Sequence, residues 1–378
     1  MMLEADRAAL LQAARTAAKV APQSSLSETL GGALIECCEE SGTAALTAAN
    51  GEAAVRLTVP ARAASSSAAL ADARLLEKLL STLKGETARL ETDGRGSLSV
   101  SDGKPGSVCR IRCRPHESYP RPDMAAPGKA FKVHGIRSLA EKTAYAAGSG
   151  QSSPAMQCVN FRAGGKAVYA EACDSARMAV AKCAATLEAG QSLMVPARLL
   201  RLLASVSDDS DAYEASEGHG HIVFRKDGME FLMRKLPGSF MDTTSVLRSA
   251  KPAHSATADA REMLRALETV AISALAETAP KPVRLAMAAG EIRVWTEGGS
   301  SEGEASVPAD TLAETPGRGF PYNAALLAQP FRLIKGRAKI EISDRGILVA
   351  KNDGELHMLA PMREPAAAAE NKGEARAA

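Results

Sequence analysis

The sequence predicts an α+β fold built from three tandem repeats, and two recurring markers support this prediction. The first is a helical pattern that ends in a charged residue and threonine; its threonines Thr16, Thr143 and Thr269 are 127 and 126 residues apart. The second is a Leu-rich segment, whose three copies are 124 and 127 residues apart. Two independent markers give one period, and three periods fill the 378 residues.

Each repeat has the same expected elements. A helix with apolar residues at i, i+3 and i+4 is followed by short alternating segments, a Leu-rich second helix and two strands joined by a turn. The helices are expected at 6–20, 73–84, 129–143, 197–205, 258–270 and 322–335. The closing hairpins are expected at 88–100, 221–233 and 338–350. Pro330 stands inside the last predicted helix, where it should kink or end that helix.

Clusters of turn-forming residues mark the expected domain boundaries. One cluster, Pro120–Gly128, lies between the first and second repeats, and Arg248–Pro252 lies between the second and third. The predicted domains are 1–122, 128–248 and 252–363. The segment 364–378 is rich in Ala, Glu and Lys and has no apolar face, so it is expected to be a disordered tail.

Composition excludes several classes of protein. Apolar residues make up 46% of the chain, which is enough for globular cores. The sequence contains no run of 18 apolar residues, so it predicts no membrane-spanning helix. The N-terminal segment has an acidic start and no apolar stretch, unlike a secretory signal. The seven cysteines include no Cys-x-x-Cys pair, which favours free thiols in the cytoplasm over a disulfide framework.

Charge is distributed unevenly between the helices and the rest of the chain. The six predicted helices carry 16 basic and 6 acidic residues, so they hold a net charge of +10 although the whole chain has only +2. If the helices line one surface, that surface attracts a polyanion such as duplex DNA through its backbone, independently of sequence. The alternative is a charged face that is simply solvated, and the first helix of the third repeat is net acidic. The basic residues expected to face DNA are Arg7, Arg15, Lys19, Lys78, Lys132, Arg137, Lys142, Arg198, Arg201, Arg332 and Lys335.

No motif predicts a catalytic, metal or cofactor site. The segment Gly299–Gly303 matches Gly-x-Ser-x-Gly, but an acidic, Gly-rich stretch follows where a hydrolase needs a helix, so a hairpin turn is favoured. The pair His219 and His221 lacks a third ligand at a suitable spacing. No phosphate-binding Gly-rich fingerprint occurs. A hydrolase that uses Ser300 remains only as a formal rival.

Three segments, together with the threefold repeat, resemble a known family. These are the closing segment Leu356–Arg363 (Leu-His-Met-Leu-Ala-Pro-Met-Arg), the stretch Glu171–Ala179 and the strand that leads to Gly238-Ser239-Phe240. The chain resembles the bacterial DNA polymerase III beta subunit, the DNA sliding clamp, over about residues 3–363, as a divergent member.

The resemblance implies a fold and a function. Two protomers would join head to tail into a ring of six clamp domains, each with two helices on antiparallel sheets, and the helices would line a central hole that holds duplex DNA. Such a homodimer would tether the replicative DNA polymerase as a non-catalytic processivity factor of the cytoplasm and nucleoid, with no cofactor. The polymerase, an ATP-driven clamp loader and repair proteins would bind it through short linear motifs. The alternative is a clamp-like scaffold that binds such motifs without encircling DNA.

The resemblance also implies a partner-motif pocket between domains two and three. Five of its twelve implied residues are methionines, whose flexible side chains suit several partners. The residues alone would favour an ordinary core for most of them. The implied lining is Met156, Cys173, Ser175, Arg177, Met178, Met241, Val246, Met358, Leu359, Pro361, Met362 and Arg363.

Ring closure in the family joins domain one of one protomer to domain three of the other. The implied interface positions are Arg74, Lys78, Cys109, Ile111, Ile272 and Leu275. The alternative is that Cys109 and Ile111 pack inside their own domain. The chain also departs from the family at Ser175-Ala176 (Gly-His), at Met241 (Pro) and in the loop 24–28, which lacks a DNA-contacting arginine.

Overall fold

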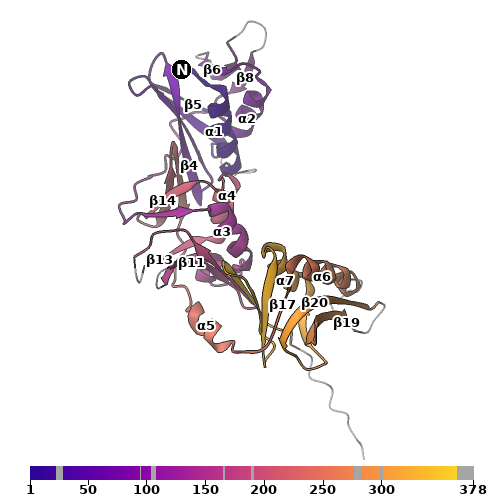
Figure 1. Cartoon of the computed structure of the whole chain (residues 1–378). Coiled ribbons are helices and arrows are strands. Elements are labelled where there is room, and N and C mark those ends of the chain that lie inside the picture. Colours follow the sequence, from indigo (N-terminus) through magenta and orange to yellow (C-terminus); the bar gives the residue numbers. More distant parts are fainter. Residues whose placement is uncertain are drawn as a thin grey trace, which may run out of the picture. The chain divides into compact units, whose positions relative to one another are not determined.

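The computed structural model describes residues 1–22, 29–93, 95–103, 108–164, 167–188, 191–275, 282–297 and 301–363 (Figure 1). The chain divides into two compact units. Unit 1 contains residues 1–144, 157–170 and 183–239, and unit 2 contains residues 145–156, 171–182 and 240 onward. The predicted tail 364–378 and the loop 24–28 lie outside the described residues. None of the described helices has the length and hydrophobicity that a transmembrane segment needs.

The order of elements repeats three times: strand, helix, four strands, helix, three strands. The first repeat consists of β1 (Met2–Asp6), α1 (Arg7–Val20), β2 (Gly32–Cys38), β3 (Thr43–Ala49), β4 (Ala53–Ala63), β5 (Ser67–Asp72), α2 (Ala73–Thr82), β6 (Thr87–Thr92), β7 (Ser97–Ser101) and β8 (Cys109–Arg112). The second consists of β9 (Phe131–His134), α3 (Ile136–Thr143), two 3₁₀ turns (Ala144–Ala146 and Pro154–Gln157), β10 (Cys158–Gly164), β11 (Ala167–Cys173), β12 (Arg177–Cys183), β13 (Ser192–Pro196), α4 (Ala197–Ser205), β14 (Ala212–Glu217), β15 (His221–Lys226) and β16 (Met229–Arg234). After a short helix α5 (Thr243–Ser249), the third consists of β17 (Pro252–Asp259), α6 (Ala260–Leu275), β18 (Pro282–Ala288), β19 (Glu291–Thr296), β20 (Gly303–Ala313), β21 (Phe320–Asn323), α7 (Ala324–Leu333), β22 (Arg337–Ser343), β23 (Leu348–Lys351) and β24 (Glu355–Leu359). The predicted three-repeat α+β fold is confirmed.

Side-chain caps fix where several helices begin. The Asp6 carboxylate accepts a hydrogen bond from the Ala9 amide at 2.7 Å, and Asp72 caps α2 in the same way. Asn323 caps α7 through the Leu326 amide at 3.1 Å. Each cap satisfies amides that the first turn of a helix leaves unpaired. The two helices of each repeat then pack side by side (Figure 1).

A continuous antiparallel sheet runs through unit 1 in the order β8-β7-β6-β1-β4-β16-β15-β14-β9. The long strand β4 pairs with β1 through its C-terminal half and with β16 through its N-terminal half. In the second pairing, Met229 lies opposite Leu57 and Phe231 opposite Val55. The pairing of β4 with β16 joins the first repeat to the second.

The sheet of unit 2 has a matching connection. Its order is β12-β24-β23-β22-β17-β20-β19-β18-β21. Arg177 on β12 lies opposite Leu359 on β24, and Met178 lies opposite Met358. The pairing of β12 with β24 therefore joins the second repeat to the third, at the position that β4 and β16 occupy in unit 1. We call these two pairings the β4–β16 joint and the β12–β24 joint.

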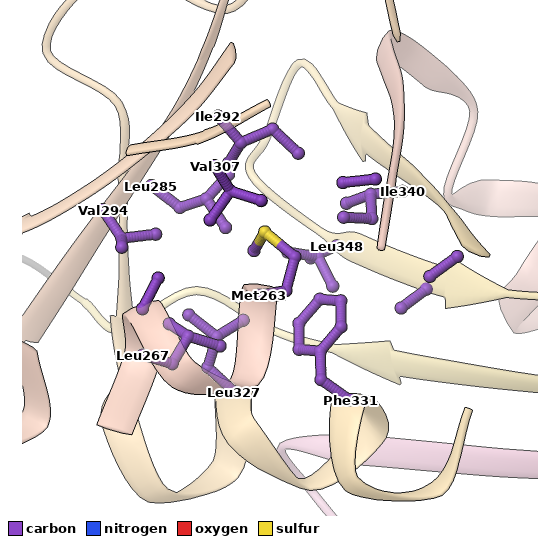
Figure 2. Packing of buried hydrophobic residues seen from close by; sticks show 14 of the residues in the cluster. Met263, Leu267, Leu285, Ile292, Val294, Val307, Leu327, Phe331, Ile340 and Leu348 are labelled. Carbon is purple, nitrogen blue, oxygen red and sulfur yellow. The ribbon is translucent and has the colours of Figure 1, made fainter. Parts of the chain in front are cut away.

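The core of the third repeat is formed where its two helices pack on the sheet (Figure 2). Met263 and Leu267 of α6 and Phe331 of α7 point toward strand residues such as Leu285 and Ile340, and all five are buried. Each such side chain contributes about 1.5–3 kcal/mol by leaving water. The apolar stripe on each helix therefore fixes which face it turns to the sheet.

Some element boundaries differ from the prediction. The expected helix 129–143 begins only at Ile136, because residues 131–134 alternate buried and exposed as β9 and Gly135 takes a left-handed conformation with φ 68°. The helix α5 was not predicted. Pro330 lies inside α7, which continues to Leu333, so the proline does not end the helix where it stands.

Candidate functional site

The twelve predicted pocket residues all belong to unit 2. Strand pairing brings Arg177 and Met178 beside Leu359 and Met358. Three of the twelve are core residues: Cys173, Met178 and Leu359 are at most 2% exposed. Met178 is thus the one buried methionine of the five, whereas the alternative interpretation expected most of them in the core. The remaining nine, which the structure leaves partly or fully exposed, are Met156, Ser175, Arg177, Met241, Val246, Met358, Pro361, Met362 and Arg363.

Two sulfur atoms meet where the strand β11 ends. The Cys173 thiol lies 3.2 Å from the Met241 thioether, and Met241 is 40% exposed. Burial raises the pKa of Cys173 to about 11, so the thiol is neutral at physiological pH. Nearby, the Thr243 hydroxyl donates to the buried Glu171 carboxylate at 2.7 Å and anchors the start of α5, which carries Val246. The exposed Met241 thioether and the helix α5 are therefore both held by contacts to buried residues, Cys173 and Glu171.

The C-terminal segment is tied down by backbone hydrogen bonds. The Ala360 amide donates to the Ala176 carbonyl and the Met362 amide donates to the Pro321 carbonyl, each at 2.8 Å. These bonds hold Pro361 between them, beside the β12–β24 joint. The predicted segment is therefore ordered in the structure up to Arg363.

Arg177 is the cation of this region, and three groups hold it. Its Nε donates to Asp174 at 3.0 Å, its Nη1 donates to Gln329 at 2.6 Å, and its guanidinium carbon lies 5.6 Å from the centre of the Tyr145 ring. The side chain keeps 18% exposure. Sequence reasoning missed Tyr145 and Gln329, because they are distant in sequence and belong to no local motif.

A groove in unit 1 collects several of the predicted DNA-facing cations. Its volume is ≈ 460 Å³, and its lining includes Arg15, Lys19, Lys78 and Arg137. Arg74 lines it as well, with Glu77 and Asp208 as the acidic members. The groove therefore has an excess of positive charge.

Arginines in unit 1 also cap the ends of neighbouring helices. Arg74, at the start of α2, donates to the carbonyls of Ala21 and Pro22 just after α1, at 3.1 and 3.2 Å. Arg7, at the start of α1, donates to the Gly85 carbonyl beyond α2 at 2.7 Å. A cation at the C-terminal end of a helix satisfies free carbonyls and opposes the negative end of the helix dipole.

The second helix pair of unit 1 repeats this arrangement. Arg137 of α3 donates to the Ser207 carbonyl after α4, and Arg201 of α4 donates to the Ala144 carbonyl after α3. Lys19 of α1 donates to the Ser205 carbonyl at 2.6 Å. Part of the positive charge counted on the helices therefore has a structural role.

The other predicted DNA-facing residues have different surroundings. Arg15 pairs with Glu77 at 3.6 Å, Arg198 pairs with Glu52, and Arg332 pairs with Glu268 at 3.3 Å. Three exposed lysines and one half-buried lysine remain: Lys78, Lys132 and Lys335, and Lys142. Lys132 lies on strand β9 and not on a helix, so the helical position expected for it was wrong.

Among the described residues, one strand edge in the first repeat and one in the third have no partner strand. β8 is the last strand of its sheet and pairs with β7. In β20, residues 309–313 pair with β17, whereas residues 303–308 pair with β19 and meet no second strand among the described residues. β4 and β12 use the equivalent half of the strand for the two joints.

The predicted interface residues lie near these edges, with one correction. Cys109 is exposed on β8, and Ile272 on α6 is 72% exposed. Ile111 is buried in its own domain at 4% exposure, because alternation along β8 turns its side chain inward. Arg74 serves as the helix cap described above, and the side chain of Leu275 lies outside the described part of the structure.

Comparison with known proteins identifies the architecture. No family model matches the chain. It is 25% identical over 185 residues to the beta sliding clamp of Streptococcus pneumoniae, a match that covers 47% of this chain and 48% of that protein. The chain thus spans about half the length of the curated relatives that it matches.

Solved structures match nearly the whole chain. The DNA polymerase sliding clamp of Bacillus subtilis has a TM-score of 0.83 at 15% identity, covering 97% of this chain and 100% of that one. The DNA polymerase III beta subunit of Thermotoga maritima has a TM-score of 0.84 at 17% identity, and the match covers 97% of this chain and 100% of that one. A Pseudomonas aeruginosa sliding clamp bound to griselimycin has a TM-score of 0.84 at 19% identity, and the match covers 96% of this chain and 100% of that one. The chain has the sliding-clamp fold. The resemblance expected from the sequence is thereby confirmed.

Residues 299 and 300 of the Gly-x-Ser-x-Gly match lie outside the described residues. Gly303 opens the strand β20, whereas a nucleophile turn needs a helix at that point. The Ser301 hydroxyl donates to the Ser273 carbonyl at 3.3 Å. Among the described residues, no group of three metal-ligating side chains could hold an ion.

Proposed function

We propose that this protein is a DNA sliding clamp and a non-catalytic processivity factor. Two copies join head to tail into a ring that encircles duplex DNA and tethers the replicative polymerase in the cytoplasm, on the nucleoid. Each of the predicted segments 1–122, 128–248 and 252–363 is one domain of the ring. The likeness to sliding clamps supports this proposal, and one feature of the strand pairing carries it.

That feature is the repeated joint. In both joints, the N-terminal part of the third strand after the first helix of one repeat (residues 53–57 of β4 and 177–181 of β12) pairs with the closing strand of the next repeat. The first closing strand, β8, and the third long strand, β20, have no such partner in the described chain. A third joint between β20 of one copy and β8 of the next continues the series, and unpaired edges readily accept a strand from another chain.

The two free edges also carry opposite charge. Arg110 and Arg112 are exposed on β8, and Glu304, which pairs with Arg293 of β19, is exposed on β20. Opposite charges across a strand pair contribute about 0.2–1 kcal/mol each. These charges therefore favour pairing of β8 of one copy with β20 of another over pairing of two β8 strands or two β20 strands.

Oligomeric state tests the ring. Light scattering should find the wild type near twice 39.3 kDa. The variant Arg110→Glu/Arg112→Glu should dissociate, and adding Glu304→Arg should restore the dimer by reversing the charges on both edges. The variant Arg95→Glu/Arg318→Glu makes the same change in charge at two exposed turn positions and should remain a dimer. A strictly monomeric wild type would contradict the ring and favour a clamp-like scaffold.

The mode of DNA binding is a second test. A ring is retained on circular duplex DNA and is released when the circle is cut, whereas simple backbone binding survives cutting and falls steeply with salt. Replacing Arg15 and Lys78 by glutamate should weaken DNA retention most, because neither side chain caps a helix. The same change at Arg95 and Arg318 is the control. Equal retention of both variants would contradict contact with DNA along the groove of unit 1.

The surface around Arg177 is the proposed site for short linear motifs of the polymerase, the clamp loader and repair proteins. Its exposed thioethers and the fixed cation provide an adaptable apolar surface with one polar anchor. Griselimycin, the ligand named for the Pseudomonas aeruginosa clamp, is a suitable probe. Met241→Glu and Met358→Glu should each weaken griselimycin binding at least about tenfold, because the bound ligand would remove water from the new carboxylate without supplying a partner for its charge. Unchanged affinity in both variants would contradict this site.

A further inference from the structure

A buried polar chain lies beneath Arg177, and the proposed function does not use it. His357 on β24 is 0% exposed. Its Nδ1 lies 2.8 Å from the Tyr145 hydroxyl, and its Nε2 lies 3.3 Å from Glu355 Oε2. Glu355 is also buried, and its carboxylate accepts a hydrogen bond from the side-chain amide of Asn352 at 3.2 Å. Buried polar groups cost free energy unless each finds a partner, so a complete chain of this kind needs a physical reason.

The neighbours of His357 determine where its proton lies. The Glu355 carboxylate can only accept, so Nε2 carries the hydrogen and donates to it. In the neutral imidazole, Nδ1 then accepts, and the Tyr145 hydroxyl donates to it. Burial raises the pKa of Tyr145, so the phenol keeps its proton for this bond. The chain therefore has one direction, from Tyr145 through His357 to Glu355.

The Tyr145 ring of this chain also contacts Arg177. The Tyr145 ring lies 5.8 Å from the His357 ring and 5.6 Å from the Arg177 guanidinium carbon. A cation over an aromatic face is worth about 0.5–2 kcal/mol, provided that the ring is held in place. The hydrogen bond to His357 holds the hydroxyl end of that ring in place. Asp174 and Gln329 accept from two of the five guanidinium N–H groups.

We propose that Tyr145 and His357 are positioning residues for Arg177. His357 holds the Tyr145 ring, the ring holds the guanidinium, and the guanidinium offers its remaining N–H groups to an acceptor on a bound peptide, a carbonyl or a carboxylate. The inference rests on the proposed function in one respect, because it requires that the surface around Arg177 binds peptides. Planar, bidentate donors lose their advantage when their orientation is lost, so the affinity depends on this buried chain.

A double-mutant cycle on the full chain tests this coupling. Griselimycin affinity is measured by calorimetry for the wild type, Tyr145→Phe, Arg177→Lys and the double variant. Tyr145→Phe keeps the ring and removes the hydroxyl, and it should weaken binding about five- to tenfold. The double variant should bind within about twofold of Arg177→Lys alone, because the hydroxyl acts through the arginine. Independent, multiplying effects or an unchanged Tyr145→Phe would overturn the proposal.

The chain offers a matched control elsewhere. The Arg162 guanidinium lies 5.6 Å from the centre of the Tyr169 ring, the same geometry as the Tyr145 pair, in unit 1. Tyr169→Phe should leave griselimycin affinity within about twofold of the wild type. An equal loss in both tyrosine variants would show a general effect on folding and would contradict positioning.

A measurement without ligand separates this inference from the proposed function. If the wild type does not bind griselimycin, the proposed pocket fails, and positioning is judged by NMR from the solvent exchange of the Arg177 Nε–H. Exchange should be at least about fivefold faster in Tyr145→Phe than in the wild type, and an equal rate would sink the inference. His357→Gln is the conservative variant, since its amide can accept from Tyr145 and donate to Glu355. It should keep slow exchange, and fast exchange would count against the role of His357.

Discussion

The two joints occupy the same position in the repeats, yet their contents differ. In the β4–β16 joint, the closing strand buries Met229, Phe231 and Met233. In the β12–β24 joint, the corresponding buried positions are Glu355, His357 and Leu359. Both pair antiparallel over five residue pairs. Backbone pairing alone therefore does not require polar side chains here, which agrees with the positioning role proposed for His357.

The largest expected effect comes from the apolar joint. Phe231→Ala should lower the free energy of unfolding by about 4 kcal/mol, because it removes a fully buried ring and leaves a cavity. Urea denaturation followed by circular dichroism measures this loss. Griselimycin affinity should be unchanged at concentrations of denaturant where the variant is folded. A loss below about 1 kcal/mol would mean that the joint repacks freely.

A smaller loss is expected when the buried polar chain is broken. Glu355→Ala should cost about 3 kcal/mol, because it leaves His357 and Asn352 without their acceptor. Glu355→Gln keeps an acceptor and should cost about 1 kcal/mol. The same urea titration distinguishes the two. Equal costs would show that the carboxylate charge, and not hydrogen bonding, holds the chain together.

Converting the polar joint into a copy of the apolar one tests the comparison directly. The triple variant Tyr145→Phe/Glu355→Met/His357→Phe gives β24 the buried pattern of β16 and removes three polar members of the chain together, so that only the part-buried Asn352 side-chain amide loses its acceptor. Its stability should lie within about 1 kcal/mol of the wild type, since apolar residues of similar volume often replace buried polar sets at no cost. Its griselimycin affinity should fall. Unfolding of the variant at room temperature would mean that the polar chain is needed for stability.

The smallest effect is expected from an ordinary ion pair beside the polar joint. Burial alone would raise the pKa of Glu341, but hydrogen bonds from Lys339 and Lys351 outweigh it and lower the pKa. The stabilisation is therefore complete above the unfolded-state pKa of about 4.3 and is lost as pH falls through the lower folded-state value. Glu341→Gln should reduce the melting temperature by about 2 °C at pH 7, and the difference from wild type should vanish below about pH 3.

Unit 1 supplies the matched case for this pH test. Burial would raise the pKa of Asp211, but its hydrogen bond from Lys226 outweighs this and lowers the pKa. Asp211→Asn should show the same loss at neutral pH and the same convergence in acid. A pH-independent difference in either variant would contradict the ion-pair explanation.

The sequence predicted the parts of the fold that local patterns determine. The hairpin at 221–233 was recognisable from apolar alternation around the turn at Asp227-Gly228, and the structure has strands at 221–226 and 229–234. The N-terminal part of the helix expected at 129–143 failed, because residues 131–134 alternate like a strand and pair with β14. The spacing between repeats, on which the prediction rested, did not show that the segment changes from strand to helix at Gly135.

The site was less accessible to sequence reasoning, for a physical reason. The resemblance indicated Arg177 and Met358, but Tyr145 and His357 are 212 residues apart and meet only through the fold. No spacing rule links a 3₁₀ turn to the last strand of the chain. Likewise, the count of cations on helices could not show that Arg74 and Arg137 are engaged by carbonyls at helix ends.

The unpaired half of β20 has a consequence for assembly. In the proposed head-to-tail assembly, each added copy joins by one edge and leaves its other edge free, so an open row of copies always keeps one free β8 edge and one free β20 edge. Growth stops only if the turning angle accumulated over successive copies brings the last end back to the first; otherwise the same contact builds an open filament. The number of subunits is thus set by the twist stored in β-sheet joints and not by the contact itself.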